Sequence, residues 1–276
     1  MQMILKYTEV QIKPIKNYLS SLNIDKDLND LSHIQELIQK HVSEFAFSSI
    51  PVLLKEELSL ELDDLYKKVI VQKKGGYCFE HNKLMYEALL SSGFDVRALF
   101  ARVLNNQDIK VPTTHRVTLL EFDEELYLVD VGFGFSSPSM PVKFGETPTK
   151  TKQGTTYLIK EYENENFALG IVLENSFYTL YTFNLQTYFD PDFEMGHFYS
   201  HKHEKANFVN NLVHSLIFEN EIRSLRNSTY QKISATDTKE TMITSTEQLK
   251  NILESEFNYP IKFQDVQYLY DNFCRV

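Results

Sequence analysis

Cys78 has the local sequence expected of a nucleophilic cysteine. It follows two glycines, Gly75 and Gly76, and precedes residues 79–90, whose apolar spacing predicts a helix. The glycines permit a sharp turn, and the N-terminus of a helix together with nearby lysines favours the thiolate over the thiol. Most free cysteines are buried and unreactive, however, so Cys78 alone does not indicate an enzyme.

His115 and Asp130 supply the two partners that such a cysteine needs. His115 stands before a predicted strand at 116–122, and Asp130 ends the next one, 126–131. If the loop at 123–125 joins these strands as a hairpin, the two residues lie near the same end of it. A carboxylate there would orient the imidazole, whose other nitrogen would face Cys78, as in a Cys-His-Asp triad. Several thiol-enzyme folds share this order, so it predicts the chemistry and not the substrate.

The elements that must position these residues change in character along the chain. Helices are predicted where apolar residues recur every three or four positions, at 28–45, 59–71 and 79–90. Gly93 suits the left-handed residue after the last of them. Short β-branched or aromatic segments predict strands at 96–103, 116–122, 126–131, 156–160, 167–173 and 177–185. Their spacing favours a barrel or a strongly curved sheet over βαβ units.

The last third of the chain predicts a smaller third part. A linker is expected over 190–192 and 200–207, and strand-like segments follow around 222–233. A helix is expected at 246–257, with Ser245 and Gln248 as its capping box. The fold class is therefore α+β. Its expected divisions are a helical part with the cysteine (1–92), a β part with His115, Asp130 and the linker (93–205) and an α/β part (206–276).

Composition limits the partners and the compartment. The chain has 276 residues and a formal net charge of −10, so a basic surface for nucleic acid or anionic lipid is not expected. No run approaches the roughly 18 apolar residues of a membrane-spanning helix, and residues 1–14 carry no apolar signal segment. The two cysteines, Cys78 and Cys274, are far apart, which favours reduced thiols. These features predict a soluble, cytoplasmic protein.

Three ordered blocks resemble the signatures of the arylamine N-acetyltransferase family. They are residues 74–82 (KGGYCFEHN), 114–116 (THR) and 129–134 (VDVGFG). The order and spacing of the blocks and the chain length also match, and the resemblance extends weakly to the C-terminus. Three blocks in order are far more specific than any one of them.

The resemblance implies a three-lobed fold of N-terminal helical bundle, central β-barrel and C-terminal α/β lid. It implies a ping-pong reaction in which Cys78 takes acetyl from acetyl-CoA and passes it to an aromatic amine, a hydrazine or an N-hydroxyarylamine. His115 would deprotonate Cys78, and Asp130 would orient His115. Backbone N–H groups, that of Cys78 among them, are the expected donors to the oxyanion.

The resemblance also implies where the substrates bind. The residues expected to contact acetyl-CoA are Thr114, Gly132, Phe133 and Gly134, and Phe133 is also expected to contact the acceptor ring. Acetyl-CoA is the co-substrate and no metal is expected. The partners are then small molecules, and the protein is a monomer or a homodimer.

Two departures from the family pattern lie close to the cysteine. The family usually has Arg where this chain has Lys74, and Phe-Glu-Asn where it has Phe-Ser-Ser at 47–49. The ion pair between that Glu and Arg is therefore expected to be absent, unless Glu44 substitutes. Losing both partners costs less than leaving one buried charge unpaired. We expect a less constrained cysteine loop and retained activity.

Other polar residues receive structural interpretations. Glu80 and Asn82 are expected to form structural hydrogen bonds, His81 to lie at the surface and Cys274 to be a bystander. A histidine-rich stretch is expected to be a solvated linker rather than a metal site: His197, His201, Lys202, His203 and Glu204. Four lysines either attract the phosphates of CoA or form a solvated face: Lys67, Lys68, Lys73 and Lys74.

Three rival functions share some of these features. An amide synthase of the same fold would use a tethered thioester as donor. A cysteine hydrolase would use the same triad to pass the acyl group to water. A non-catalytic scaffold has no need of Cys78, His115 and Asp130 together, so the sequence favours an enzyme.

Overall fold

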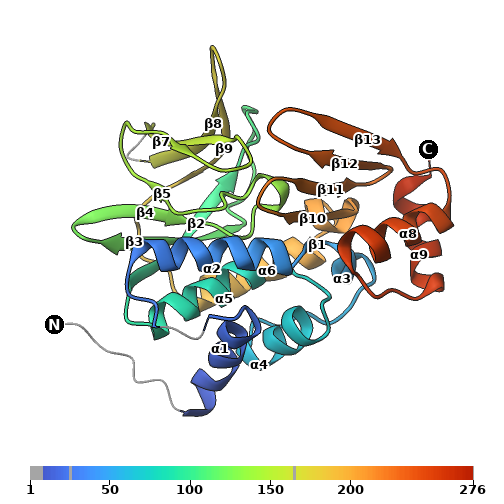
Figure 1. Ribbon diagram of the computed structural model, residues 1–276, viewed down its shortest axis with the longest axis horizontal. Coiled ribbons are helices and arrows are strands. Elements are labelled where there is room, and N and C mark those ends of the chain that lie inside the picture. The colour runs from blue at the N-terminus through green and yellow to red at the C-terminus, as the bar shows by residue number, and fades with distance from the viewer. Residues whose placement is uncertain (1–8, 25–26, 164–165, 276) are drawn as a thin grey trace.

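Helices form the first part of the chain in the computed structural model, which describes residues 9–24, 27–163 and 166–275 (Figure 1). They are α1 (Glu9–Ser21), α2 (Leu31–Glu44), α3 (Ile50–Leu53), α4 (Leu62–Leu65), the π-helical η1 (Tyr66–Val71) and α5 (Cys78–Ser91). In α2 the apolar residues fall at steps of three and four and are buried, which confirms the predicted face. Gly93 follows α5 with φ +90°, as expected for a helix end.

The middle of the chain forms an eight-stranded sheet that curves into a nearly closed barrel. Its strands are β2 (Asp95–Val103), β3 (His115–Phe122), β4 (Glu125–Val129), β5 (Val142–Lys143), β6 (Thr149–Lys150), β7 (Thr156–Tyr162), β8 (Asn166–Val172) and β9 (Phe177–Phe183). Their order is β5-β4-β3-β2-β9-β8-β7-β6, and a bridge between Phe144 and Ile159 draws the two ends together. A short 3-10 turn, η2 (Gly134–Ser136), follows β4. The expected barrel is therefore confirmed.

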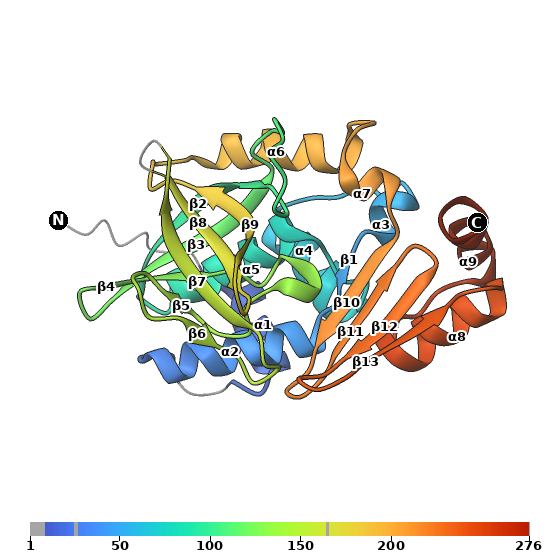
Figure 2. The ribbon, with the colours of Figure 1, turned by 90° about the horizontal axis from the view of Figure 1, so that it is seen from above.

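The last part is a second sheet with helices on its outer side (Figure 2). Its elements are β10 (Val213–Ile217), β11 (Ile222–Arg226), β12 (Thr229–Ile233), β13 (Thr238–Met242), α8 (Thr246–Phe257), α9 (Phe263–Leu269) and η3 (Tyr270–Cys274). The first strand of this sheet comes from the N-terminal part: β1 (Phe47–Ser48) pairs antiparallel with β10. Ser245 caps α8 by accepting from Gln248 N at 3.2 Å, while the Gln248 side chain accepts from Thr244 N instead of closing a capping box.

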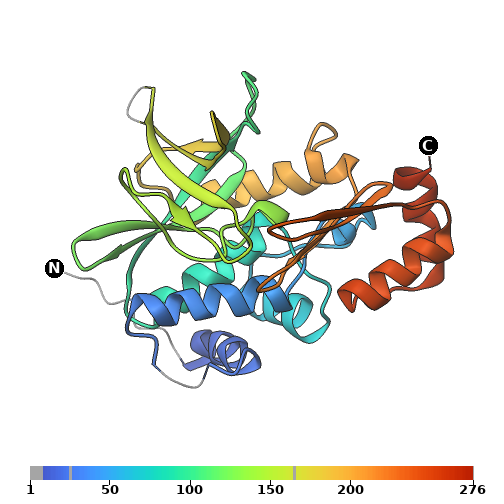
Figure 3. The ribbon, with the colours of Figure 1, turned by 45° about the horizontal axis from the view of Figure 1, so that its top comes forward.

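The predicted linker over 190–192 and 200–207 is wrong, because most of it is helix. Helix α6 (Asp190–Lys202) lies on the side of the molecule away from α2, and a short helix, α7 (Asn207–Asn210), follows it (Figures 2 and 3). Gly196 lets α6 approach the core closely, since a Cβ there would lie 2.8 Å from the Phe79 ring. The exposed face of α6 carries Met195 and Phe198, so the helix lacks the clean apolar stripe by which sequence patterns identify helices.

The order of helices, barrel and α/β part confirms the α+β fold class. The division after residues 92 and 205 stays a prediction.

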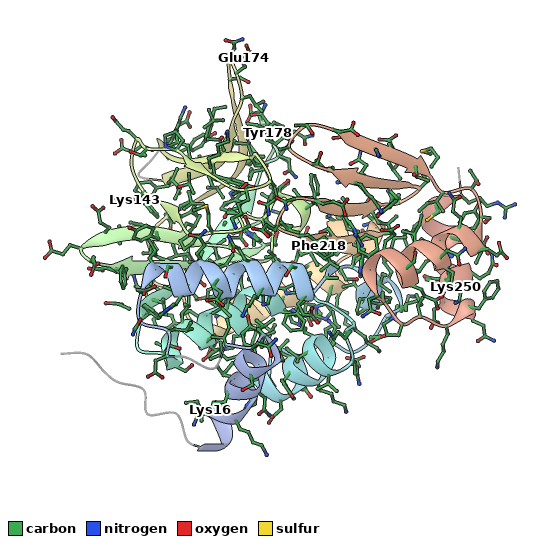
Figure 4. All side chains as sticks on the ribbon, in the orientation of Figure 1. Lys16, Lys143, Glu174, Tyr178, Phe218 and Lys250 are labelled. Atoms are coloured by element: carbon green, nitrogen blue, oxygen red, sulfur yellow. The ribbon has the colours of Figure 1, made fainter. Side chains whose placement is uncertain are left out.

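The β8–β9 hairpin projects from the barrel, with Glu174 at its outer tip (Figure 4). Within the described ranges, no helix is long and apolar enough to cross a membrane.

Candidate active site

Cys78 is the first residue of α5 and lies at the bottom of a cavity. Its side chain is buried, and Sγ donates a hydrogen bond to Thr114 O at 3.7 Å. The helix start is capped from within, because Glu80 accepts from Tyr77 N at 3.1 Å. The sulfur is thus held at a helix N-terminus beside the strand that begins at His115.

The loop before Cys78 requires its glycines. Gly75 has φ +65°, and a Cβ there would lie 2.2 Å from Ala46 O. Gly76 forms two backbone hydrogen bonds with the segment 46–48. Gly76 N donates to Ala46 O at 3.1 Å, and Gly76 O accepts from Ser48 N at 2.6 Å. A side chain at Gly75 would force this pairing apart.

The β3–β4 hairpin brings His115 and Asp130 together. The strands pair from Phe122 opposite Glu125 to Thr118 opposite Val129, so the two site residues lie at the open end. His115 Nε2 lies 2.7 Å from Asp130 Oδ2, and both side chains are buried. Because Asp130 holds Nε2, Nδ1 is the ring nitrogen that remains available.

Four donors surround the Asp130 carboxylate. Oδ2 accepts from His115 and from Tyr181 OH at 2.9 Å, and Oδ1 accepts from Asn82 Nδ2 at 2.8 Å and from Gly132 N at 2.9 Å. Burial by itself would raise the pKa of Asp130, but these hydrogen bonds and the neighbouring His115 outweigh it and lower the pKa. The carboxylate is therefore charged and fixed in orientation.

Asn82 and Tyr181 anchor this carboxylate from opposite sides. Asn82 Nδ2 also donates to Arg116 O at 2.6 Å, and its Oδ1 accepts from Val131 N at 3.0 Å. It therefore ties α5 to the barrel, which agrees with its expected structural role. Tyr181 was not identified from the sequence. It lies in β9, 51 positions from Asp130 in the chain, and no local pattern marks it.

Opposing influences act on the pKa of the Cys78 thiol. Burial raises the pKa of this thiol, and the charges of Asp130 and Glu80 raise it further, although the backbone N–H groups of Arg116 and Phe79 lower it. Burial and the two carboxylates thus oppose the effect that is expected from the helix N-terminus and the lysines. The sequence could not show that the thiol is almost wholly removed from water.

The cavity that opens onto Cys78 and His115 has a volume of about 790 Å³. Aromatic side chains from several parts of the chain line it: Phe47, Phe133, Tyr178, Tyr199 and Phe208. Thr114 and Gly134 are also among the lining residues, as are two exposed cations, Lys205 and Arg226. Such a cavity suits a flat apolar ring close to the sulfur.

Gly132 has a different position from Thr114, Phe133 and Gly134. It is not among the described residues that line the cavity. A Cβ on it would lie 2.7 Å from Asn82 Nδ2 and 2.8 Å from Cys78 Cα. The glycine therefore allows the segment after β4 to pack directly against the start of α5.

The expected loss of the charge pair between positions 48 and 74 is observed, but the lysine has another partner. Lys74 pairs with Glu56 at 2.7 Å, and Glu44 pairs with Lys73 instead. Ser48 is buried and lies 2.9 Å from His214 Nδ1. Lys68 also has a partner, Glu80 at 2.5 Å. Three of the four lysines near the cysteine are thus engaged in ion pairs.

Two histidines do not lie where the sequence predicts. His81 is fully buried, not at the surface, because its ring nitrogens pair with His41 and with backbone carbonyls. His197 is buried within α6, where Nδ1 forms a hydrogen bond with Tyr77 OH. Among the residues that the structure describes, no three His, Cys, Asp or Glu side chains form a group that could hold a metal ion.

Comparison with known proteins gives matches over most of the chain. A family model described as N-acetyltransferase matches residues 30–266. The sequence is 30% identical to the arylamine N-acetyltransferase of Escherichia coli over 67% of this chain and 66% of that protein. It is 31% identical to the arylamine N-acetyltransferase / N-hydroxyarylamine O-acetyltransferase of Salmonella typhimurium over 63% of this chain and 62% of that protein. The matched region thus spans slightly less than two thirds of these relatives.

The fold comparison extends further than the sequence comparison. The arylamine N-acetyltransferase of Mycobacterium marinum in complex with CoA superimposes with a TM-score of 0.87. The match covers 95% of this chain and 100% of that one at 23% sequence identity. At this identity the likeness establishes the fold alone.

Proposed function

The chain belongs to the arylamine N-acetyltransferase family, and we propose that it transfers acetyl from acetyl-CoA to aromatic amines and hydrazines. N-hydroxyarylamines are a further acceptor class, since the Salmonella relative carries that activity in its name. One observation carries the proposal. Cys78 and His115, which is hydrogen-bonded to Asp130, open together into one aromatic cavity.

We assign the proton transfer to Cys78, His115 and Asp130. Because burial raises the pKa of the thiol, Cys78 needs a base at the moment of attack. His115 Nδ1 would take that proton, and Asp130 would stabilise the imidazolium through Nε2 at 2.7 Å. The thiolate then attacks the thioester carbonyl, and the leaving CoA sulfur takes the proton back from His115.

The second half of the reaction reuses the same groups. The neutral amine attacks acetyl-Cys78, its proton passes to His115, and Cys78 leaves as the thiolate. An arylamine is weakly basic and mostly neutral at pH 7, so it needs little deprotonation before attack. The rings of Phe47, Phe133 and Phe208 would hold it against the sulfur. Contacts of acetyl-CoA with Thr114, Phe133 and Gly134 belong to the same proposal, since all three line the cavity.

Release of CoA tests this function directly. Purified protein is mixed with acetyl-CoA and followed with a thiol reagent, with and without a panel of arylamines, hydrazines and N-hydroxyarylamines. We expect amine-dependent release, acetylation of Cys78 when the amine is omitted, and loss of both in Cys78→Ala and Cys78→Ser. A folded Cys78→Ser variant that kept the full rate would contradict the mechanism.

The same assay separates the rival enzymes. Release of CoA that continues at full rate without an amine would indicate a hydrolase. A reactive Cys78 that takes no acetyl from acetyl-CoA would indicate a synthase with a tethered donor. Either result would overturn the proposed function.

A further inference from the structure

Three buried side chains that the proposed reaction does not use form a chain of hydrogen bonds beneath the loop of Cys78. Tyr18 OH lies 2.7 Å from His41 Nδ1, and His41 Nε2 lies 2.8 Å from His81 Nδ1. His81 Nε2 in turn lies 3.0 Å from Ala46 O and 3.1 Å from Gly76 O. The three side chains come from α1, α2 and α5 and are fully buried.

These hydrogen bonds have only one consistent direction. Carbonyl oxygens only accept, so His81 Nε2 must carry the hydrogen. Burial lowers the pKa of both histidines, that of His81 to about 4, so at neutral pH each ring has a single N–H. His81 Nδ1 is then free to accept from His41 Nε2. By the same logic His41 Nδ1 accepts from Tyr18, and every polar atom of the chain is satisfied.

The hydrogen on His81 Nε2 faces the two carbonyls that hold the glycine turn in place. Ala46 O, which His81 approaches, also accepts from Gly76 N at 3.1 Å. Gly76 O, its second acceptor, also accepts from Ser48 N at 2.6 Å. His81 therefore bridges both carbonyls of the pairing that shapes the loop, and Cys78 follows Gly76 by two residues. The His81 ring is also stacked on that of Phe47, a residue of the cavity wall, with 6.3 Å between the ring centroids.

We propose that His81 is a positioning residue, which fixes the turn that presents Cys78 to the cavity. His41 and Tyr18 set its tautomer from behind, so that its single hydrogen faces the turn. The first helix of the chain thereby acts on the nucleophile through two imidazole rings. This inference rests on the proposed role of Cys78, but it adds a residue that makes no contact with the reacting atoms.

A matched pair of substitutions at one position tests the inference. His81→Leu removes both nitrogens, whereas His81→Gln keeps an N–H close to the place of Nε2. We expect His81→Leu to slow acetylation of Cys78 about 10-fold to 100-fold, because a small misplacement of a reacting group has effects of this size. We expect the Kd for acetyl-CoA to change less than about 3-fold, because His81 is not among the described residues that line the cavity. His81→Gln should recover most of the rate.

Two measurements that need no acetyl transfer keep this test separate from the proposed function. The first is the rate of Cys78 alkylation by iodoacetamide, which should follow the same order of wild type, Gln and Leu. The second is the imidazole nitrogen spectrum of the wild-type protein labelled with nitrogen-15. Both His41 and His81 should show the Nε2–H tautomer, and Tyr18→Phe should shift the signals of His41.

The inference fails on any of three results. An Nδ1–H tautomer at either histidine would mean that these hydrogen bonds do not run in the proposed direction. Equal rates for His81→Leu and wild type would remove the positioning role, and equal losses in the Gln and Leu variants would reduce it to packing. If wild-type Cys78 is alkylated but takes no acetyl group, the proposed function fails, and the alkylation rates still decide this inference.

Discussion

Tyr181 donates its hydroxyl hydrogen to Asp130 Oδ2 at 2.9 Å, and so it shares that oxygen with His115. The phenol comes from β9, on the far side of β2 from the hairpin that carries the other two residues. Its ring also lies 4.9 Å from the His115 ring. Tyr181 thus orients both members of the pair, through a hydrogen bond to one and a ring contact with the other.

Tyr181→Phe should therefore slow turnover while leaving the fold intact. A hydrogen bond to a charged group contributes about 1.5–3 kcal/mol, and a change of about 1.4 kcal/mol is tenfold in rate, so we expect a loss in kcat of about 10-fold to 100-fold. The control is Tyr157→Phe in the same barrel, because Tyr157 OH donates to Ser136 O and not to Asp130. Equal losses in the two variants, measured by CoA release, would contradict the assigned role.

Gly132→Ala should impair both stability and acetylation. The new methyl group would meet the Cys78 backbone at 2.8 Å, and overpacking of this kind costs about 1–3 kcal/mol. Gly93→Ala is the control, since that site has open space and only an unfavourable φ of +90°. Urea unfolding should show a loss in both variants, whereas the rate of Cys78 acetylation should fall only for Gly132→Ala. A wild-type rate for Gly132→Ala would show that the segment after β4 need not pack so closely against α5.

Replacing Lys68 should cost much more unfolding free energy than replacing Lys74, although both lysines form ion pairs beside the cysteine loop. Glu80, the partner of Lys68, is fully buried, so Lys68→Met leaves a buried charge short of its partner and should cost about 3 kcal/mol of unfolding free energy. Lys74 and Glu56 are both about one third exposed, so Lys74→Met should cost less than about 1 kcal/mol. Lys74→Met should also keep its acetyltransferase activity. Denaturant titration of the two variants compares them, and similar losses would refute the distinction.

Acid should destabilise the protein through its buried histidines. Burial lowers the pKa of His81 from 6.5 to about 4 and that of His214 to about 3. The unfolded chain therefore takes up protons that the folded protein does not, so stability is full above pH 6.5 and falls as the pH drops toward 4. Each histidine contributes up to about 1.4 kcal/mol per pH unit in that range.

Unfolding free energies measured between about pH 7 and pH 4.5 give the slope of stability against pH. His214→Phe is the informative variant, because the His214 ring packs between Phe257 and Tyr259 and its Nε2 has no hydrogen-bond partner in the described structure. His214→Phe should reduce the slope of unfolding free energy against pH by the contribution of one proton, up to about 1.4 kcal/mol per pH unit. An unchanged slope would show that His214 stays neutral in the unfolded chain or charged in the folded one.

Local sequence patterns predicted the elements that carry their own signals. The helix α8 begins and ends where its apolar spacing and Ser245 predict, and the β3–β4 hairpin brings His115 to Asp130 as expected. These features depend on neighbours within a few residues or on a short loop. Amphipathic spacing and turn chemistry are sufficient to predict them.

Residues whose partners are distant in the chain were not predictable in this way. His81 looks like a surface residue until His41, 40 positions earlier, supplies a hydrogen bond that permits burial. Helix α6 owes its place to Gly196 and to the bond of His197 with Tyr77, 120 positions away. A polar side chain gives no sign of whether a partner will meet it.

Strand β1 has a consequence for how the protein is made. Its partner, β10, begins at Val213, so the ribosome must synthesise three quarters of the chain before Phe47 and Ser48 can pair. Until then, the segment that fastens the glycine turn has a bare edge toward β10. A nascent or truncated chain therefore holds Cys78 in an incompletely supported loop. The full set of contacts around the Cys78 loop therefore forms only after β10 has been synthesised.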